Sequence, residues 1–345
     1  MSRFIKSLQE VEDFKIEEKR KFFSATHEEI EKGLTTDIYF IRTQEILRYL
    51  QLENIVVTAE IFPREEGILA GVQEVYNLLK DKKIKLWSLK EGEIFQGKET
   101  VMRIEGPYSE FGIFETVILG ILASSSAWAT AAWKCKEAAG DKKIICFGSR
   151  HIHPAVAPVM ERSALVGGVD GVSCILGAKL SETKPQGTIP HAVIIVVGDT
   201  VKVAKAYHLC MPPNVPRIIL VDTFKDEAEE SIRVAKTLKK HLTGVRLDTP
   251  SERGGVTPDL VKEVRARLDL AGFSEVKIFV SGGLNPERIT ILSKLPADAF
   301  GVGSYISDAS PIDMTLDIKE VEGKPLAKRG RIPGKIENER LERIL

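Results

Sequence analysis

The sequence predicts an α/β protein in which an N-terminal α+β domain precedes an incomplete (β/α) barrel. From residue 143 onward, short apolar runs alternate with helical patterns, as in a parallel sheet that is buried on both faces. Nearly every run ends in small or polar residues, which in a barrel gather on the carboxyl-terminal rim. No Gly-x-Gly-x-x-Gly motif follows the first run, which favours a barrel over a doubly wound sheet.

The elements follow in order. Residues 1–35 read as charged helix and linker, and residues 108–139 as an apolar helix. Between them, strands are predicted at 55–62, 85–89, 93–97 and 99–106, around a helix near 72–79. Barrel strands are predicted at 144–148, 191–198, 217–223, 243–249, 276–283 and 297–304, with helices at 231–242, 259–272 and 285–295. Residues 314–334 read as a hairpin.

A chain of 345 residues has room for two domains, or for one large barrel with an appendage. We predict an N-terminal α+β domain at 1–120, the barrel at 121–304, and a C-terminal tail at 305–345 whose hairpin returns to the N-terminal domain. The chain is 43% hydrophobic and 28% charged, which is ordinary for a globular protein with a sizeable core.

Charge and cysteine content exclude several classes of protein. Lys+Arg and Asp+Glu both number 49, so neither nucleic acid nor an anionic membrane is expected as a partner. No apolar run approaches the length of a membrane span, and the charged N-terminus does not resemble a secretory signal. The cysteines form no Cys-x-x-Cys pair, which argues against a zinc site or a disulfide framework. We therefore expect a cytoplasmic protein with reduced cysteines.

Two glycine-rich segments follow consecutive predicted strands. Ser281, Gly282 and Gly283 end one strand and open a helix, and the next strand ends in Gly301-Val-Gly303-Ser304. Glycines allow backbone N–H groups to close around a phosphate, and late barrel strands commonly carry a phosphate site. One such segment is explained equally well by a tight turn, but the ordered pair favours phosphate binding.

Charged residues end other predicted strands. Asp222 and Asp248 could hold ribose hydroxyls or a phosphate-bound Mg²⁺, or could simply cap the helices that follow. Arg246 projects from the same side of its strand as Asp248, and its burial requires an anion or that carboxylate. Arg150, beside His151, has the planar guanidinium that suits a carboxylate or a pyrophosphate. The nearby His-x-His pair lacks further ligands, so no protein metal site is predicted.

Three further residues have competing explanations. His191 begins a predicted strand and is either structural or functional. Asp170 lies in a glycine-flanked turn, which turn chemistry explains equally well. We include Asp170 and Lys179 among the predicted substrate-binding residues.

The residues from Asp37-Ile-Tyr39 to the segment 327–334 resemble the nicotinate phosphoribosyltransferase family, a type II phosphoribosyltransferase family, in a short archaeal-like form. The specific part is 147–180, a Phe-Gly-x-Arg stretch followed by a helix and a Gly-x-Asp turn. The resemblance implies an N-terminal α/β domain, an incomplete barrel, and head-to-tail homodimers or larger assemblies with shared active sites. It also implies transfer of phosphoribose from phosphoribosyl pyrophosphate to nicotinate, with Mg²⁺ and often with ATP.

Individual residues carry over from the family motifs. Tyr39 would stack on the pyridine ring from a partner subunit, Phe147 would cover the opposite face of the ring, and Arg150 would bind the pyridine carboxylate. Arg246 and Asp248 match an Arg-x-Asp element on the ribose and pyrophosphate side. Gly282, Gly283, Gly301 and Gly303 match the phosphate loops, and His191 matches a phosphorylatable histidine, although its surroundings lack the Glu-His-Ser context of ATP-coupled relatives.

The predicted chemistry needs no catalytic base, because the pyridine nitrogen attacks with a free lone pair. Mg²⁺ and arginine would stabilise the leaving pyrophosphate, and Asp248, with Asp222, the positive charge that develops on the ribose. Quinolinate remains an alternative substrate, although two carboxylates require a denser cationic pocket. Nicotinamide is another, with Asp170 accepting from its amide. A barrel lyase that uses Lys179 as a Schiff-base nucleophile is a distant third alternative.

Overall fold

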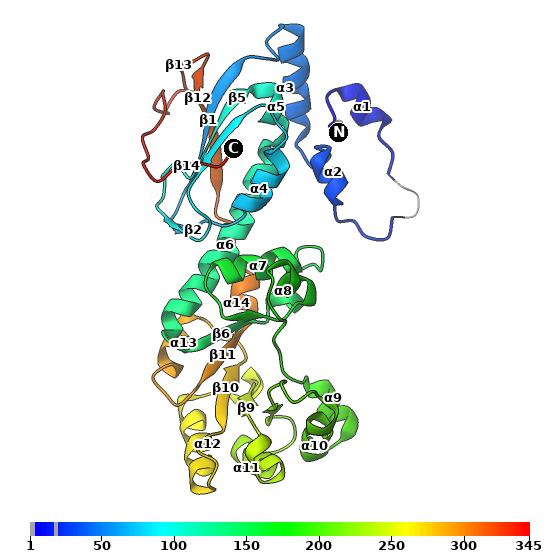
Figure 1. The fold of residues 1–345 in the computed structure, drawn as a ribbon, viewed down its shortest axis with the longest axis vertical. Coiled ribbons are helices and arrows are strands. Elements are labelled where there is room, and N and C mark those ends of the chain that lie inside the picture. Colours follow the sequence, from blue (N-terminus) through cyan, green and yellow to red (C-terminus); the bar gives the residue numbers. More distant parts are fainter. Residues whose placement is uncertain (1–3, 17–19) are drawn as a thin grey trace. The chain divides into compact units, whose positions relative to one another are not determined.

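The computed structural model of the chain describes residues 4–16 and 20–345. It divides into two compact units, which we call unit 1 (Met1–Ala127 with Ser310–Leu345) and unit 2 (Trp128–Ala309). Each unit has a six-stranded sheet of its own. Figure 1 labels the helices and strands.

Unit 1 is built on an antiparallel sheet with the strand order β13-β12-β1-β5-β3-β14, and a small two-stranded sheet pairs β2 with β4. Its strands are β1 (Val56–Pro63), β2 (Gly67–Ile68), β3 (Lys85–Ser88), β4 (Ile94–Phe95), β5 (Met102–Pro107), β12 (Met314–Val321), β13 (Lys324–Pro325) and β14 (Glu342–Arg343). Its helices are α1 (Leu8–Asp13), α2 (His27–Glu31), α3 (Ile38–Tyr49), α4 (Val72–Leu79), α5 (Tyr108–Phe111), the 3-10 turn η1 (Gly112–Phe114) and the first half of α6 (Glu115–Ala139).

The C-terminal tail completes the N-terminal sheet. β12 pairs with the central strand β1 in the register Ala59↔Ile318, and β14 pairs with β3. Residues alternate between buried and partly buried along β5, as expected for a sheet with one face on a core. The prediction that the tail returns to the N-terminal domain is confirmed.

Unit 2 contains an all-parallel sheet with the strand order β7-β6-β11-β10-β9-β8. Its strands are β6 (Lys143–Cys146), β7 (Gly171–Val172), β8 (Ile218–Leu220), β9 (Gly244–Leu247), β10 (Lys277–Ser281) and β11 (Ala299–Val302). The longer helices are α7 (Ala157–Val166), α8 (Ile175–Leu180), α9 (His191–Val197), α10 (Thr200–Cys210), α11 (Glu227–Leu238), α12 (Pro258–Leu270) and α13 (Pro286–Leu292). Short turns of helix are η2 (Gly148–His151), η3 (Lys239–His241), η4 (Ser251–Arg253) and α14 (Ser304–Ser307).

The strands of unit 2 are buried throughout their central residues. Ile144, Ile219, Val245, Ile278 and Val302 are all fully buried in one apolar core. Such continuous apolar strands belong to a parallel sheet covered by helices on both faces. Because β7 and β8 lie at opposite ends of the strand order, the barrel is incomplete, as predicted.

One predicted strand is wrong. Residues 191–198 form helix α9, which starts after Pro190 and ends at Gly198 in a left-handed conformation. A short apolar run does not distinguish a strand from a helix by periodicity. Ile195 and Val196 are exposed in the chain, so the run is apolar without being a core strand.

The apolar helical stretch Tyr108–Ala139 has the length and composition of a membrane span, but 61% of its most apolar window is buried within the protein. A helix that packs in the core of a protein is mostly buried in this way. All four cysteines are free. Burial raises the pKa of the Cys135 and Cys146 thiols to about 12.

Candidate active site

Parallel strands bring their carboxyl ends to one edge of the sheet in unit 2, and most of the predicted site residues follow these ends. In strand order from the β6 side, this edge carries Phe147, Arg150 and His151 after β6, Gly303 and Ser304 after β11, Gly282 and Gly283 after Ser281 of β10, Asp248 after β9, and Asp222 after β8. We call it the carboxyl edge.

Arg246, Asp248 and Ser281 form a hydrogen-bonded group at the centre of the carboxyl edge. Arg246 Nε donates to Ser281 Oγ at 2.8 Å, and Arg246 Nη2 donates to Asp248 Oδ2 at 3.2 Å. Ser281 Oγ in turn donates to Asp248 Oδ1 at 2.8 Å. Both oxygens of Asp248 are thereby fixed in place, and the partly buried guanidinium meets a carboxylate that balances its charge.

The same arginine connects this group to the pyridine side predicted from the motifs. Arg246 Cζ lies 5.1 Å from the centre of the Phe147 ring, within the range of a cation–π contact. Arg246 Nη1 donates to Thr188 Oγ1 at 3.0 Å. Each nitrogen therefore has a protein partner, while N–H groups remain on both Nη atoms for a ligand.

Two glycines at the carboxyl edge are required by geometry. Gly282 has φ +91°, and a Cβ atom there would lie 3.1 Å from Asp248 Oδ1. A Cβ atom on Gly301 would lie 2.4 Å from the Phe147 ring, closer than any side chain tolerates. Glycine therefore lets β11 pass behind the aromatic ring, and lets the turn after β10 approach the carboxylate.

His191 and Asp222 form a pair at the β8 end of the carboxyl edge. His191 Nε2 lies 2.8 Å from Asp222 Oδ2, and the hydrogen bond to this buried carboxylate raises the pKa of His191. Since Nε2 faces the carboxylate, a neutral His191 carries its lone pair on Nδ1. The second oxygen of Asp222, Oδ1, is buried without a hydrogen-bond partner in the described part of the chain.

Arg150 and His151 are exposed in the turn η2 after β6. Among residues 4–16 and 20–345, none forms a hydrogen bond or an ion pair with the Arg150 guanidinium. His151 lies against Gly303, where a Cβ atom would come within 3.1 Å of its Nε2. Arg150 is thus a cation without a protein partner in the described chain. It follows Phe147 closely in the sequence, after the end of the same strand.

The structure corrects the placement of Asp170. This residue precedes β7, so it lies at the amino end of the strands and not at the carboxyl edge. Its carboxylate accepts from the Ile144 N–H at 2.9 Å and pairs with Lys136 at 2.9 Å. These contacts give Asp170 a structural role in holding β6 and β7 together.

Lys179 and Tyr39 lie outside the hydrogen-bonded group of the carboxyl edge. Lys179 is exposed on α8, so it lacks the desolvation that activates a Schiff-base lysine. Tyr39 belongs to unit 1, where it is 54% exposed on α3.

Sequence reasoning missed two residues that contact the site. Thr188, in the loop before α9, accepts from Arg246, and no local signal pointed to it. Arg288 Nη1 lies 3.4 Å from the Gly283 carbonyl oxygen and its Nη2 donates to the Val256 carbonyl. Its position in the first helical turn after Gly282-Gly283 is a sequence signal that it lies near the predicted phosphate loop.

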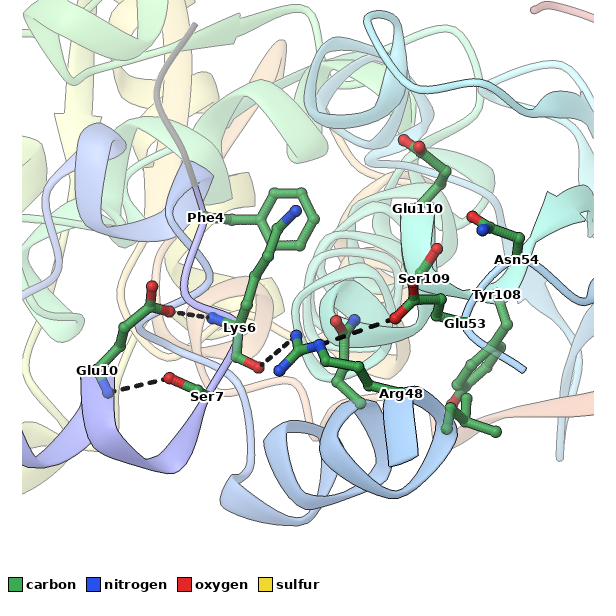
Figure 2. Close-up of a pocket in the computed structure, with 12 residues that line it drawn as sticks. Phe4, Lys6, Ser7, Glu10, Arg48, Glu53, Asn54, Tyr108, Ser109 and Glu110 are labelled. Carbon is green, nitrogen blue, oxygen red and sulfur yellow. Dashed lines mark hydrogen bonds and ion pairs between the residues drawn. The ribbon is translucent and has the colours of Figure 1, made fainter. Parts of the chain in front are cut away.

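A separate cavity of about 450 Å³ lies in unit 1 (Figure 2). Two of its charged side chains have protein partners within it: Glu10 accepts from the Lys6 backbone N–H at 2.6 Å, and Arg48 lies 3.8 Å from Glu53. It holds none of the predicted site residues. No cluster of three or more metal-ligating side chains occurs in the part of the chain that the structure describes.

Known proteins resemble the chain in both sequence and structure. The sequence model of the quinolinate phosphoribosyl transferase C-terminal domain matches residues 128–317, and that of the N-terminal domain matches residues 37–126. The chain belongs to the quinolinate phosphoribosyltransferase family.

Curated relatives of the chain are named nicotinate phosphoribosyltransferases. Nicotinate phosphoribosyltransferase pncB2 of Mycobacterium tuberculosis is 29% identical over 70% of this chain and 53% of its own length. The nicotinate phosphoribosyltransferase of Bacillus subtilis is 32% identical over 65% of this chain and 46% of its own length. The predicted resemblance to nicotinate phosphoribosyltransferases is confirmed. The chain spans about half the length of these curated relatives.

Solved structures share the fold of this family member. The crystal structure of nicotinate-nucleotide pyrophosphorylase from Pyrococcus furiosus is 46% identical, with a TM-score of 0.88 over 92% of this chain and 82% of the other. Human nicotinic acid phosphoribosyltransferase has a TM-score of 0.72 at 18% identity, over 87% of this chain and 77% of the other, and shares the fold. Similar proteins are thus named for two reactions, that of a nicotinate-nucleotide pyrophosphorylase and that of a nicotinic acid phosphoribosyltransferase.

Proposed function

We propose that this protein transfers the phosphoribosyl group of phosphoribosyl pyrophosphate to nicotinate, giving nicotinate mononucleotide and pyrophosphate. The observation that carries the proposal is the arrangement at the carboxyl edge. The Arg150 guanidinium, which has no partner in the described chain, follows the end of β6 as Phe147 does, and the fixed carboxylate of Asp248 lies beside the glycine turn at Gly282. A guanidinium that lacks a protein partner in the described chain suits the carboxylate of nicotinate.

The residues fit this chemistry without a base. The pyridine nitrogen forms its bond to ribose C1 with its own lone pair, and the electrons of the breaking C1–O bond leave with pyrophosphate. Positive charge develops on the ribose, and a carboxylate that is already oriented stabilises it without reorganisation. Asp248 meets this requirement because Arg246 and Ser281 fix both of its oxygens. Holding both substrates in line supplies much of the remaining rate.

Mg²⁺ would arrive with phosphoribosyl pyrophosphate and neutralise the charge of the departing pyrophosphate. Asp222 fits such an ion, because its Oδ1 is a carboxylate oxygen that lacks a hydrogen-bond partner in the described chain. Asp248 has no such oxygen free, since both of its oxygens accept from protein donors. We therefore assign Asp222 to Mg²⁺ and Asp248 to the ribose.

ATP coupling is a separate part of the proposal. His191 directs Nε2 to Asp222, and its Nδ1 has no hydrogen-bond partner among the residues that the structure describes. A neutral imidazole held in this way presents a nucleophilic Nδ1 to a phosphoryl group. Formation of ADP in step with nicotinate mononucleotide, lost in His191→Ala, is the expected result. Product formation at the same rate without ATP would make His191 structural.

Quinolinate is the second candidate substrate, favoured by the 46% identity to a protein named nicotinate-nucleotide pyrophosphorylase. Purified protein is incubated with phosphoribosyl pyrophosphate, Mg²⁺ and either nicotinate, quinolinate or nicotinamide, with and without ATP, and kcat/KM is compared. We expect nicotinate to be used best. Faster turnover of quinolinate, with release of carbon dioxide, would overturn the proposal.

We also propose that two copies of the chain share their active sites. Tyr39, which is expected to cover the pyridine, is exposed on α3 together with Ile46 and Tyr49. In unit 2, α9 exposes Ile195 and Val196. Exposed apolar groups of this kind are typical of surfaces buried between subunits.

A further inference from the structure

Two buried glutamates of unit 2 are not explained by the chemistry proposed above. Glu161 on α7 is 0% exposed and Glu227, the first residue of α11, is 2% exposed. Within the described chain neither carboxylate forms an ion pair. A buried carboxylate without a cation is costly unless several donors or a specific partner satisfy it. The partners of both glutamates lie next to residues of the carboxyl edge.

Glu161 connects the ends of two strands. Its Oε1 accepts from Ser149 Oγ at 2.6 Å and from Ser173 Oγ at 2.9 Å, and its Oε2 accepts from the Cys174 N–H at 2.6 Å. Ser149 immediately precedes Arg150 in η2 after β6, whereas Ser173 and Cys174 follow β7. The turn that carries Arg150 is thereby tied to the neighbouring strand end through one carboxylate.

Glu227 makes the corresponding connection on the other side of the site. Its Oε1 accepts from Thr249 Oγ1 at 2.7 Å, and both groups are buried. Thr249 immediately follows Asp248 at the end of β9, and α11 follows β8. The backbone that carries Asp248 is thus tied to the adjacent helix.

We propose that Glu161 and Glu227 are positioning residues, Glu161 for the pyridine and Glu227 for phosphoribosyl pyrophosphate. This inference rests on the proposed function, which assigns Arg150 to the pyridine carboxylate and Asp248 to the ribose. Neither glutamate touches a substrate; each fixes the main chain beside a residue that does. A displacement of one ångström at such a residue is enough to reduce the rate strongly.

A general structural role would give a different result from a positioning role. Loss of a core interaction lowers stability and affects both substrates alike, whereas loss of one tether moves one subsite. The two glutamates serve as controls for each other, because both are buried in unit 2 and both accept from a hydroxyl next to a site residue. The decisive quantity is the ratio of the two KM changes.

The test uses paired substitutions in the 345-residue chain. Glu161→Gln and Glu227→Gln keep the shape of the side chain and remove the charge. Ser149→Ala and Thr249→Val remove the tethered hydroxyl, and Ser149→Thr and Thr249→Ser retain it. KM and kcat are measured for both substrates, with melting temperature as the check on folding.

Glu161→Gln and Ser149→Ala should raise KM for the pyridine by about tenfold or more and change KM for phosphoribosyl pyrophosphate by less than about twofold. Glu227→Gln and Thr249→Val should show the opposite preference, with the larger rise in KM for phosphoribosyl pyrophosphate. The hydroxyl-retaining variants should recover most of the loss. If the glutamine variants do not fold, the serine and threonine variants decide the matter alone.

Equal effects on both substrates, or none in folded variants, would overturn the inference. The proposed function is decided first and separately, by the wild-type comparison of the three pyridines. The KM ratios are then measured with whichever pyridine the wild type uses. Without turnover of any pyridine, titration of phosphoribosyl pyrophosphate by calorimetry still tests Glu227 against Glu161, because only the Glu227 variants should bind it more weakly.

Discussion

Arg150 decides the choice of pyridine in this proposal. Its guanidinium has no partner in the described chain, and a hydrogen-bonded ion pair with a substrate carboxylate contributes roughly 1.5–3 kcal/mol. Arg150→Ala should therefore raise KM for nicotinate by about 10- to 100-fold and leave KM for phosphoribosyl pyrophosphate nearly unchanged. Arg267→Ala, which removes an exposed arginine paired with Glu263, is the control. A parallel rise in both KM values would remove Arg150 from the pyridine subsite.

Asp248 tests the chemistry at the ribose. Asp248→Asn retains an oxygen that can accept from Ser281 but removes the negative charge, so kcat should fall by about 100-fold or more while the melting temperature changes little. Steady-state kinetics and thermal unfolding measure the two quantities. Asp259→Asn, at an exposed position on α12, controls for loss of charge. An unchanged kcat would exclude Asp248 from the reaction.

His191 makes the site sensitive to pH. The hydrogen bond that its imidazole donates to Asp222 raises the pKa of His191 above the ordinary value near 6.5. The stability that this pair contributes is fully present below the unfolded pKa, and it is lost as the pH rises through the folded pKa. Asp222→Asn should therefore lower the pKa of His191, as followed by NMR of the six imidazoles, with His191→Gln providing the assignment. An unaltered titration would show that Asp222 is not the cause.

At the scale of elements, the close passage of β11 behind Phe147 is a testable constraint. A Cβ atom on Gly301 would overlap the ring, so Gly301→Ala should displace Phe147, raise KM for nicotinate and cost about 1–3 kcal/mol of stability. Gly120→Ala, in α6 with open space around it, should not destabilise the protein. Kinetics and urea unfolding of both variants provide the comparison. A wild-type KM and wild-type stability in Gly301→Ala would mean that β11 and the Phe147 ring move apart at little cost.

An apolar run followed by a polar or glycine ending predicted most strands of unit 2 correctly. The runs at β8, β9, β10 and β11 combine apolar residues with a polar or glycine end, and each is a strand. The run at 191–198 has the same kind of ending, Gly198-Asp199, but its apolar residues fit a helix equally well. Pro190 before it and Gly198 at its end are signals of helix boundaries, but neither residue by itself excludes a strand.

At the scale of the whole molecule, prediction of the site depended on knowing at which end of a strand a residue lies. Asp222, Asp248 and Gly282 follow strands, and parallel topology brings them to one edge. Asp170 has a similar local sequence but precedes its strand, which places it at the opposite edge. The tether from Glu161 could not be predicted, because it depends on packing between separate elements.

Subunit association is the last prediction, and it concerns Tyr39. If a partner's Tyr39 covers the pyridine, the variants Tyr39→Ala and Arg150→Ala should each be impaired alone. Mixed under conditions that exchange subunits, they should form heterodimers in which one site lacks both residues and the other is intact, so activity should return to about one quarter of the wild type. Light scattering establishes the assembly, and a mixture of Arg150→Ala with Asp248→Asn, both within unit 2, is the control without recovery. If the subunits exchange but activity returns in neither mixture, Tyr39 lies outside the partner's site.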